Sequence, residues 1–434
     1  MTTMYNNGLT KTIKNIFWML FDKVFILLIN LVLTVKVANH YGKSAYGTYQ
    51  YALSIIALME ISLAFLDPRV LKKSYDCEDN GEIVWNATIT RVVLSAVMLI
   101  CNLIYCFITP EGREYKVLMM LLTVNSIVIG LRFGMANRYE YILQSRKTII
   151  SSNISITVAA VLQLIAISRE MPIVAIAGIN LFSSFICFLL IWKQYVNQFG
   201  RLKQGELKPE FIKSLLQQSF PLALATSCSI IYSRCDSVMI GNMLSKDDVG
   251  VYSLALKLIG IVLIGVGPIR ESVYPKLLYL YEKDKAEYEK LYLQITSVMT
   301  WLYIAGVLVS FIILPYALLV LKPEYIEVFP IYRVYVLGTF FVYNAALRAG
   351  HFTMINRGSI MVTSTTLSML LNVLLNLSCI YFWGLYGAAI ATVVTQGASL
   401  MLSNVFFGKE GREVFKWQIR AINPKWMISI FFKN

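Results

Sequence analysis

The sequence predicts an all-α membrane protein of about twelve transmembrane helices. Hydrophobic residues make up 57% of its 434 positions and charged residues only 15%, whereas a soluble domain is roughly half apolar and about a quarter charged. Apolar runs of roughly 20 residues, the length that crosses a bilayer as a helix, recur along the whole chain. A membrane β-barrel would instead show alternating segments of about ten residues. Helices are therefore expected.

The expected spans are bounded by short polar loops. They lie at approximately 15–38, 46–66, 84–108, 117–137, 148–168, 172–192, 219–242, 249–270, 292–314, 327–347, 360–383 and 386–407. The first of them shows no signal-peptidase pattern and is expected to stay uncleaved. The two longest loops, 193–213 and 271–291, are expected to form amphipathic helices along the membrane surface.

The net charge of +14 follows from topology rather than from a nucleic-acid partner. With the N-terminus in the cytoplasm, 26 of the 39 Lys and Arg residues fall on the cytoplasmic side and 6 on the outside. This asymmetry is the positive-inside pattern of membrane proteins. Because the number of spans is even, both termini are expected in the cytoplasm, and no nucleic-acid partner is expected.

Composition argues against a metal centre and against an enzyme. The seven cysteines form no CxxC pair and the chain has only two histidines, so a zinc-type site is not expected. The loops are too short to hold an active-site domain. Any activity would have to reside within the helix bundle, and the expected function is transport.

An internal repeat divides the chain. The segments Gly47–Leu53 and Gly250–Leu256 both read GxYxxAL, lie 203 residues apart, and each follows a short outer loop. Six spans separate them, so both copies have the same orientation in the membrane. Such a parallel repeat is typical of transporters built from two six-helix lobes about an axis along the membrane normal. The expected lobes are residues 1–200 and 201–434.

Four segments carry a family resemblance. They are Val37–Gly42, Tyr232–Gly241, Leu371–Asn376 and Gly384–Thr392, which reads GLYGAAIAT and is the most specific. In these segments, in span number and in loop length, the chain resembles the O-antigen and capsular polysaccharide flippases of the multidrug/oligosaccharidyl-lipid/polysaccharide exporter superfamily. It departs from that family at Leu66–Arg69, where small residues are more common.

The resemblance implies a fold, a cargo and partners. The fold is a V-shaped pair of lobes. The cargo is an oligosaccharide on an undecaprenyl-diphosphate-type lipid, moved from the cytoplasmic to the outer leaflet of a bacterial inner membrane for O-antigen (lipopolysaccharide) or capsule assembly. A polysaccharide polymerase and a chain-length regulator would be partners, alongside membrane lipids.

Charges within the spans are the candidate functional groups, because each costs roughly 2.5–3.5 kcal/mol on insertion scales. Ten occur in or near spans, seven of them cationic: Asp22, Lys23, Lys36, Glu60, Arg91, Arg132, Arg234, Asp236, Lys257 and Arg333. A surplus of cations suits a carrier of diphosphate groups. The predicted cationic cavity contains Arg91, Arg132, Arg234, Lys257 and Arg333.

Two alternatives remain open for these cations. Arg91 and Arg132 could instead reach out to phosphates of the inner leaflet. Arg234, Asp236, Lys257 and Arg333 could form a structural salt-bridge network between helices. The three embedded carboxylates, Asp22, Glu60 and Asp236, are candidates for proton or sodium coupling, and Asp236 is also the expected counter-ion of Lys257 or Arg333. No other cofactor is expected.

Polar stripes and prolines complete the predicted site. Thr365, Ser368, Asn372 and Asn376 share one helix face, and Thr392, Gln396, Ser399 and Ser403 share another. They would either line a sugar-accommodating cavity or hydrogen-bond neighbouring helices. Asn125 lies on the face of Arg132. Pro268, flanked by Gly265 and Gly267, is the predicted hinge.

Two other functions compete with the flippase. A cation-coupled multidrug exporter of the same superfamily would favour an acidic, aromatic-lined cavity, which the cationic excess disfavours. A glycan polymerase would carry a long outer loop, and every expected outer loop is short.

Overall fold

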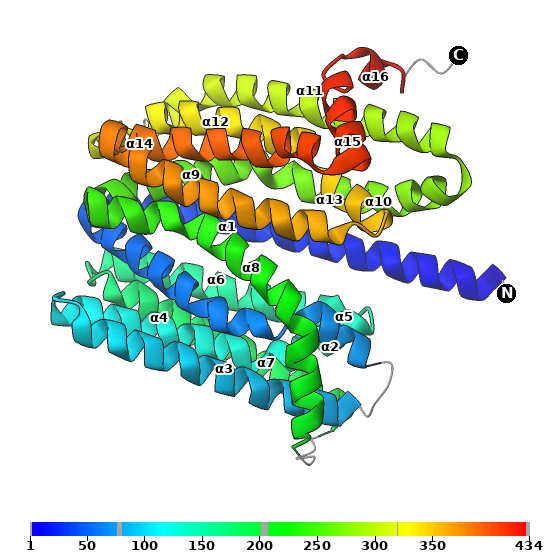
Figure 1. The fold of residues 1–434 in the computed structure, drawn as a ribbon. Helices are drawn as coiled ribbons and strands as arrows, with labels where there is room; N and C mark the ends of the chain where they lie inside the picture. The colour runs from blue at the N-terminus through cyan, green and yellow to red at the C-terminus, as the bar shows by residue number, and fades with distance from the viewer. Residues whose placement is uncertain (1, 76–79, 201–206, 319, 431–434) are drawn as a thin grey trace. The chain divides into compact units, whose positions relative to one another are not determined.

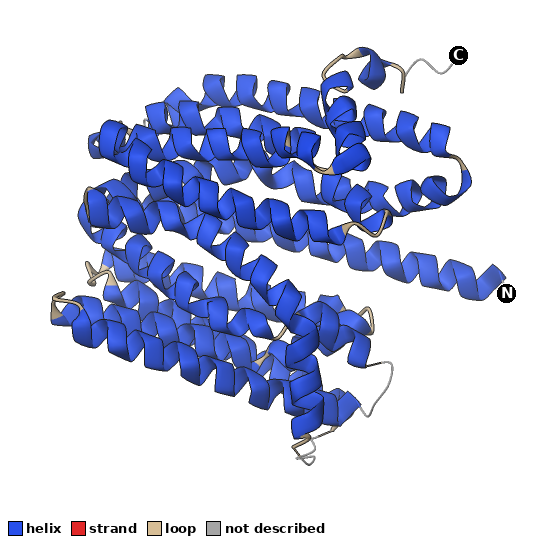
Figure 2. Ribbon diagram, in the orientation of Figure 1, coloured by secondary structure: helices blue, strands red, loops and turns tan. Residues whose placement is uncertain are grey.

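The computed structural model describes residues 2–75, 80–200, 207–318 and 320–430. Within these ranges the chain forms α-helices joined by short loops and 3₁₀ turns, and it contains no strand (Figure 2). The predicted all-α class is confirmed. Lipid offers backbone groups no hydrogen bonds, so a spanning chain must satisfy them internally, and the helix does so.

The chain divides into two compact units, Met1–Ile230 and Ile231–Asn434. The division falls inside the helix α8 (Pro209–Met243), so each unit takes one part of it. The predicted lobe boundary between residues 200 and 201, which assigns this helix to the second lobe alone, stays a prediction.

The first unit is a bundle in which α7 packs against both α4 and α6, α1 against α6, and α3 against α4. Its elements before α8, coloured from blue to green in Figure 1, are α1 (Thr2–Met59), the 3₁₀ turn η1 (Glu60–Phe65), α2 (Pro68–Ser74), α3 (Asn80–Ile108), α4 (Arg113–Leu131), α5 (Phe133–Tyr141), α6 (Ser145–Ser168) and α7 (Val174–Phe199).

In the second unit α12 is the central helix and packs against α14, α11 and α9. The elements are α9 (Lys246–Val262), η2 (Leu263–Gly265), α10 (Val266–Lys283), α11 (Lys285–Leu318), η3 (Pro323–Tyr325), α12 (Val328–Asn344), α13 (Arg348–Met354), α14 (Gly358–Leu400), η4 (Leu402–Phe406), α15 (Gly408–Arg420) and α16 (Lys425–Ile428).

Glycines in left-handed conformation break the two longest helices. In α1, Gly42 has φ 75° and ψ 171°, and in α14, Gly384 has φ 56° and ψ −135°. Glycine adopts these angles without the clash that a Cβ would cause. The breaks coincide with the predicted outer turns near residues 42 and 384, so α1 and α14 each contribute two spans.

The number of spans follows from these breaks. Among the described residues, nine helical segments are long and apolar enough to cross a membrane, and those of α1 and α14 each contain a break. The helix α8 is more polar and supplies one further span. Together they make twelve, so the chain is a multi-pass membrane protein, as the sequence predicted.

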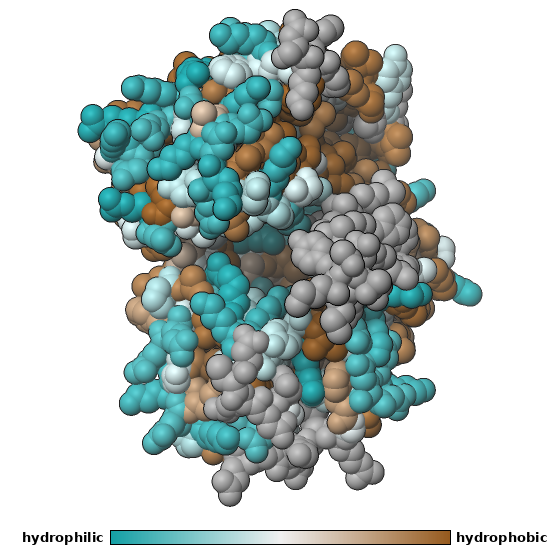
Figure 3. Space-filling model, turned by 90° about the vertical axis from the view of Figure 1, so that its right-hand side faces the viewer, coloured by the Kyte–Doolittle hydropathy of each residue, from teal (hydrophilic) through white to brown (hydrophobic). Residues whose placement is uncertain are grey.

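The surface matches this assignment. Large apolar side chains are exposed along the helix flanks, among them Phe107 at 89%, Ile312 at 67% and Phe406 at 85%, where lipid rather than water would cover them. The face in Figure 3, which includes the α10–α11 turn of the second unit, is largely hydrophilic.

The segments 193–213 and 271–291, predicted as amphipathic helices along the membrane surface, are not single helices in the described residues, and their lying along the surface stays a prediction. The helices α7 and α10 continue through Phe199 and Lys283, and α8 and α11 begin at Pro209 and Lys285. The spanning helices therefore extend beyond the apolar runs, because the flanking residues include many good helix formers. Residues 201–206 lie outside the description.

The two parts of α14 on either side of the break at Gly384 pack closely at Gly387, and this close packing gives a testable prediction. A Cβ on Gly387 would lie 1.9 Å from the carbonyl oxygen of Cys379, whereas one on Gly306 in α11 would meet nothing within 4 Å. Replacement of Gly387 by Ala should therefore destabilise the protein by about 1–3 kcal/mol through overpacking. The readout is the thermal unfolding midpoint in detergent, with Gly306→Ala as the control. Equal unfolding midpoints for both variants would contradict the close packing of Gly387 against Cys379.

Candidate substrate and ion sites

A hollow of about 590 Å³ opens in the first unit between η1, α3, α4 and α8. Its charged lining residues are Glu60, Asp67, Arg69 and Arg91. Two of these, Glu60 and Arg91, are predicted site residues that the fold brings together from separate spans. The Arg91 cation interacts electrostatically with the Glu60 carboxylate, although no ion pair joins them among the described side chains.

Arg91 is only partly satisfied. Its guanidinium lies 4.1 Å from the ring centroid of Phe133, and its Nη1 donates to the carbonyl oxygen of Leu63. The Nε atom is buried without a hydrogen-bond partner in the protein. Glu60 instead accepts a hydrogen bond of 2.5 Å from Ser126 Oγ. A guanidinium carries five donors, so Arg91 retains capacity for an anion entering the hollow.

Asp67 explains the departure from the family at Leu66–Arg69. Its carboxylate caps α2 by accepting from the backbone N–H of Arg69 at 2.7 Å, and it pairs with the Arg69 guanidinium at 2.8 Å. Pro68 occupies the first helical position, where its missing N–H has no cost. The segment is a helix start with a side-chain cap, which Ala or Gly could not provide.

Arg132 lies in a second hollow of the same unit, of about 460 Å³. The two hollows share the lining residues Pro68, Ile129 and Phe133, so they adjoin. Arg132 donates to the thiol sulfur of Cys187. The structure thus places Arg91 and Arg132 in neighbouring hollows, not in one cavity. Asn125 lines neither of them, and its buried Oδ1 has no hydrogen-bond partner in the protein.

The second unit contains a buried carboxylate, Asp236 on α8, which is 6% exposed. Its Oδ2 accepts from Tyr252 at 2.8 Å and from Thr392 at 2.9 Å. Its Oδ1 accepts from Asn376 Nδ2 at 2.7 Å and from the Cys235 thiol at 3.5 Å. Four neutral donors from three helices therefore hold the carboxylate.

The prediction that Asp236 is the counter-ion of Lys257 or Arg333 is wrong. Every partner that holds Asp236 is neutral, and the described residues show no ion pair between it and either cation. Arg234 lies two positions from Asp236 on α8, which on a helix directs the two side chains to different sides. The salt-bridge network considered as an alternative is absent among the described residues for the same reason.

The three predicted cations of the second unit are exposed. The charges of Arg234 and Lys257 lie close enough to act on each other. Arg333 stacks over the ring of Phe329, with 3.7 Å between its Cζ and the centroid. Like charges repel, so Arg234 and Lys257 form a cationic surface that an anion would stabilise. Asp22 lies outside the residues whose side chains the structure describes.

The predicted polar lining surrounds Asp236. Asn372 and Asn376 are fully buried, and Asn372 Oδ1 accepts from Asn376 at 3.1 Å and from the Cys235 thiol at 3.0 Å. Gln396 is 7% exposed and hydrogen-bonds Tyr232. The helix-pairing alternative thus describes these amides better than an open lining does. Three amide atoms stay unpaired within the protein: Asn372 Nδ2, Asn376 Oδ1 and Gln396 Oε1.

Pro268 lies in the first turn of α10, directly after the 3₁₀ turn η2 that separates α9 from α10. The hydroxyl of Tyr343 donates to the carbonyl oxygen of Val262 at this break, which satisfies a group that a continuous helix would have bonded itself. The helix is therefore interrupted where the sequence predicted it. A hinge motion at Pro268 stays a prediction.

Comparison with known sequences identifies the family. A family described as polysaccharide biosynthesis protein matches residues 12–280, which is well over half of the chain. The chain belongs to this family. The resemblance inferred from the sequence is thereby confirmed at the level of the polysaccharide biosynthesis family. A comparison with curated proteins finds no match.

Several solved structures of membrane transporters share the fold. A multidrug resistance MATE family transporter of the MOP superfamily, in an inward-facing conformation, has a TM-score of 0.72 at 15% identity, covering 91% of this chain and 94% of that one. The lipid II flippase MurJ has a TM-score of 0.70 at 16% identity, covering 97% and 99%. A MOP superfamily transporter from Pyrococcus furiosus has a TM-score of 0.61 at 13% identity, covering 95% and 96%.

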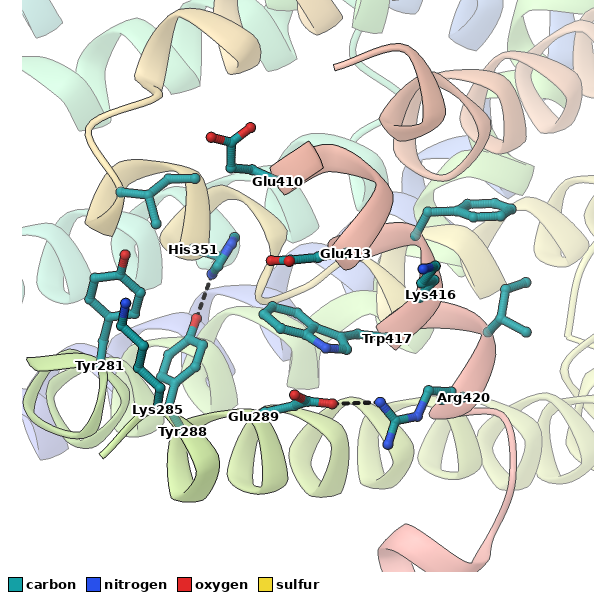
Figure 4. A pocket seen from close by; sticks show the side chains of 13 residues that line it. Tyr281, Lys285, Tyr288, Glu289, His351, Glu410, Glu413, Lys416, Trp417 and Arg420 are labelled. Carbon is teal, nitrogen blue, oxygen red and sulfur yellow. Dashed lines mark hydrogen bonds and ion pairs between the residues drawn. The ribbon is translucent and has the colours of Figure 1, made fainter. Parts of the chain in front are cut away.

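The family member described here also has a pocket that sequence reasoning missed. It has a volume of about 710 Å³ and lies between α10, α11, α13 and α15 (Figure 4). Tyr288 and His351 Nδ1 are 2.7 Å apart, and Arg420 pairs with Glu289. At the start of α15, its own backbone N–H and the nearby Arg357 guanidinium lower the pKa of Glu410. The ion pair between Arg420 and Glu289 joins α15 to α11 across this pocket.

Arg348 is a residue that sequence reasoning missed. It directly follows the predicted span 327–347, outside the apolar run, yet it is 1% exposed. Its Nε donates to Asn404 Oδ1 at 2.6 Å, and its Nη2 donates to Ser364 at 3.1 Å and to Ser403 at 3.5 Å. Neutral acceptors from α14 and η4 thus hold a buried guanidinium. Of these acceptors, only Ser403 belonged to a stripe visible in the sequence.

This network predicts the effect of removing Arg348. Replacement by Leu leaves the acceptors on Asn404 and Ser364 buried and unpaired, which should destabilise the protein by about 2–4 kcal/mol. The thermal midpoint in detergent measures it. Arg357→Leu is the control, because Arg357 is 58% exposed and its ion pair with Glu410 is long, at 3.6 Å. If the two variants unfold at the same temperature, the network is not stabilising.

Proposed function

We propose that this protein flips a diphosphate-linked oligosaccharide lipid across the membrane. The observation that carries the proposal is the set of cations without carboxylate ion pairs in the described residues: Arg91 in its hollow, and Arg234 with Lys257 on the second unit. Membership of the polysaccharide biosynthesis family and a fold shared with the lipid II flippase support it.

The physical argument is charge compensation. An unpaired cation within a span is costly, and it is retained where a ligand supplies the opposite charge. Diphosphate oxygens match the fork of a guanidinium and accept from it bidentately. Arg91 has such capacity left, because its Nη1 bonds the Leu63 carbonyl and its Nε is buried, while its Nη2 makes no hydrogen bond within the described residues. An anionic head group would therefore bind more favourably here than a cationic drug.

The finer proposal concerns the cargo and its route. We propose an undecaprenyl-diphosphate-type lipid bearing an O-antigen or capsule repeat unit, moved by alternating access in a bacterial inner membrane with both termini in the cytoplasm. The lipid tail would stay in the bilayer while the head group meets Arg91, then Arg234, Lys257 and Arg333. Pro268 would serve as the hinge, and a polymerase with its chain-length regulator would receive the product.

A multidrug exporter is the second candidate, because the shared fold also includes a multidrug transporter. One observation favours it: the Glu60 carboxylate lines the first hollow together with Phe133, an arrangement suited to an organic cation. For the superfamily transporter from Pyrococcus furiosus, a reverse polarity of the binding pocket suggests a different function. Polarity of the pocket is thus the property to test here as well.

We further propose that Asp236 couples transport to a proton or sodium gradient. A carboxylate held by hydroxyl, amide and thiol groups can take up a proton, or it can bind Na⁺ if the same oxygens turn toward the ion. The unpaired Asn376 Oδ1 and the Thr392 hydroxyl are further oxygen ligands beside it. Glu60 and Asp22 stay proposals for the same role.

The first prediction from this function concerns Arg91. Replacement by Ala should reduce surface polysaccharide by about tenfold or more, because charge-assisted hydrogen bonds contribute about 1.5–3 kcal/mol. Arg91→Lys should retain part of the export, since it keeps the charge. Complete lipid-linked repeat units should accumulate in the cytoplasmic leaflet, as extraction and labelling would show.

The control for Arg91 is Arg113→Ala, which removes an exposed cation at the start of α4 and should leave export unchanged. Drug susceptibility separates the two candidate functions. Full polysaccharide export by Arg91→Ala at normal expression, together with increased drug sensitivity, would reject the flippase in favour of the exporter.

The second prediction concerns coupling. Asp236→Asn keeps the shape of the side chain but removes its charge, so gradient-driven transport into proteoliposomes should lose its dependence on the imposed ion. Asp248→Asn is the control, because Asp248 lies at the first turn of α9 and bonds Ser245 at 2.6 Å. Separate sodium and proton gradients identify the ion. Undiminished stimulation in Asp236→Asn would exclude this residue as the coupling group.

A further inference from the structure

The Arg132 hollow has an amphiphilic lining that the proposed function does not use. The helices α2, α4, α5, α6 and α7 all contribute to it. Ile129, Ile149 and Ile191 provide apolar surface, and the hydroxyls of Thr148 and Ser152 lie in the same lining. A pocket of about 460 Å³ with this composition is large enough for a small polar head group and the start of a chain.

Arg132 is the charge of this hollow that has no acidic partner among the described residues. Its hydrogen-bond partner is the thiol of Cys187, a weak acceptor, so most of its five donors stay available. The other charges neutralise each other, because Lys72 pairs with Glu140 at 2.6 Å. The hollow therefore carries one net positive charge.

Arg132 is predicted to lie within reach of lipid phosphates. It lies roughly 8 Å inside the predicted cytoplasmic edge of its span, at 1.5 Å per residue. A guanidinium at this depth reaches toward the interface, where phosphodiesters of the inner leaflet lie. Ile129, which is 40% exposed, and Ile149 supply apolar surface beside Arg132, and this surface suits a lipid better than a fully soluble ion.

We propose that this hollow binds the phosphate group of an anionic membrane lipid such as phosphatidylglycerol. Arg132 donates to the phosphate oxygens, and the Ser152 hydroxyl adds a donor. The Thr148 hydroxyl donates to the Ser145 carbonyl, with 2.8 Å between the two oxygens, so its oxygen can still accept from a glycerol hydroxyl. Ile129 and Ile149 contact the start of the acyl chains.

The lipid site is distinct from the proposed cargo site. Phe133, Pro68 and Ile129 are common walls of the two hollows, and the Arg91 guanidinium stacks on Phe133 from α3. A bound lipid would therefore face the Arg91 hollow across this shared wall. The inference stands independently of which glycan, drug or ion the protein transports.

The test uses the purified full-length chain in detergent, without glycan, titrated with phosphatidylglycerol and followed by native mass spectrometry. Arg132→Ala should lower the affinity for phosphatidylglycerol by about tenfold, the loss expected for charge-assisted hydrogen bonds. Arg146→Ala is the matched control, because Arg146 is exposed near the start of α6 but does not line the hollow. It should change binding less than twofold.

Two further variants keep the test decisive if Arg132→Ala fails to fold. Cys187→Ala removes the protein partner of Arg132 and should leave binding equal or tighter. Ser152→Ala should weaken binding about threefold. Weaker binding by Cys187→Ala, or unchanged binding by Ser152→Ala and by Arg132→Ala where it folds, would show that no lipid phosphate occupies the hollow.

Titrations with glycerol phosphate and with phosphatidylcholine show whether the hollow selects a lipid over a soluble phosphate and an anionic lipid over a zwitterionic one. Preference for phosphatidylglycerol over both supports the lipid site. Arg132-dependent binding of glycerol phosphate at equal strength would retain a phosphate site but overturn the lipid as its occupant. Equal binding of phosphatidylcholine and phosphatidylglycerol would overturn selection by the anionic charge.

Discussion

The stabilisation of charge inside the hydrocarbon region is the constraint on which this structure depends. A buried ion is tolerated when fixed dipoles surround it and is costly when they do not. Asp236 and Arg348 illustrate the first case: hydroxyl, amide and thiol groups hold the former, and amide and hydroxyl oxygens hold the latter. Arg91 and Arg132 illustrate the second, since each faces a hollow with donors to spare. Satisfied charges support the helix packing, and incompletely satisfied ones are available to a ligand.

The two units use this constraint differently. In the second unit, the Asp236 network joins α8, α9 and α14 through short hydrogen bonds, and the Arg348 network joins α13 to α14 and η4. Such buried polar networks specify how helices pair, because a half-satisfied network is worse than an apolar contact. In the first unit Arg91 and Arg132 instead line hollows, so the packing leaves them beside space that a ligand can enter.

Backbone breaks place these side chains. The 3₁₀ turn η1 lies next to Arg91 and provides the Leu63 carbonyl that it bonds, and η2 precedes Pro268. A regular α-helix would have used such carbonyls internally. At η1 the Leu63 carbonyl accepts from Arg91 as well as from the backbone N–H of Leu66, and at η2 the Val262 carbonyl accepts from the Tyr343 hydroxyl.

The sequence by itself determined the fold class, the number of spans and the family, because apolar length and glycine-marked turns are local properties. It also identified Arg91, Arg132, Asp236 and the Asn372–Asn376 face. Only the tertiary structure decided their partners. In the structure Asp236 bonds neutral groups and not the cations, and Arg91 and Arg132 line two different hollows. Arg348, which directly follows a predicted span, is buried. The physical reason is that hydrogen bonding and desolvation depend on which helices meet and at which rotation, and residue spacing along one helix does not contain that information.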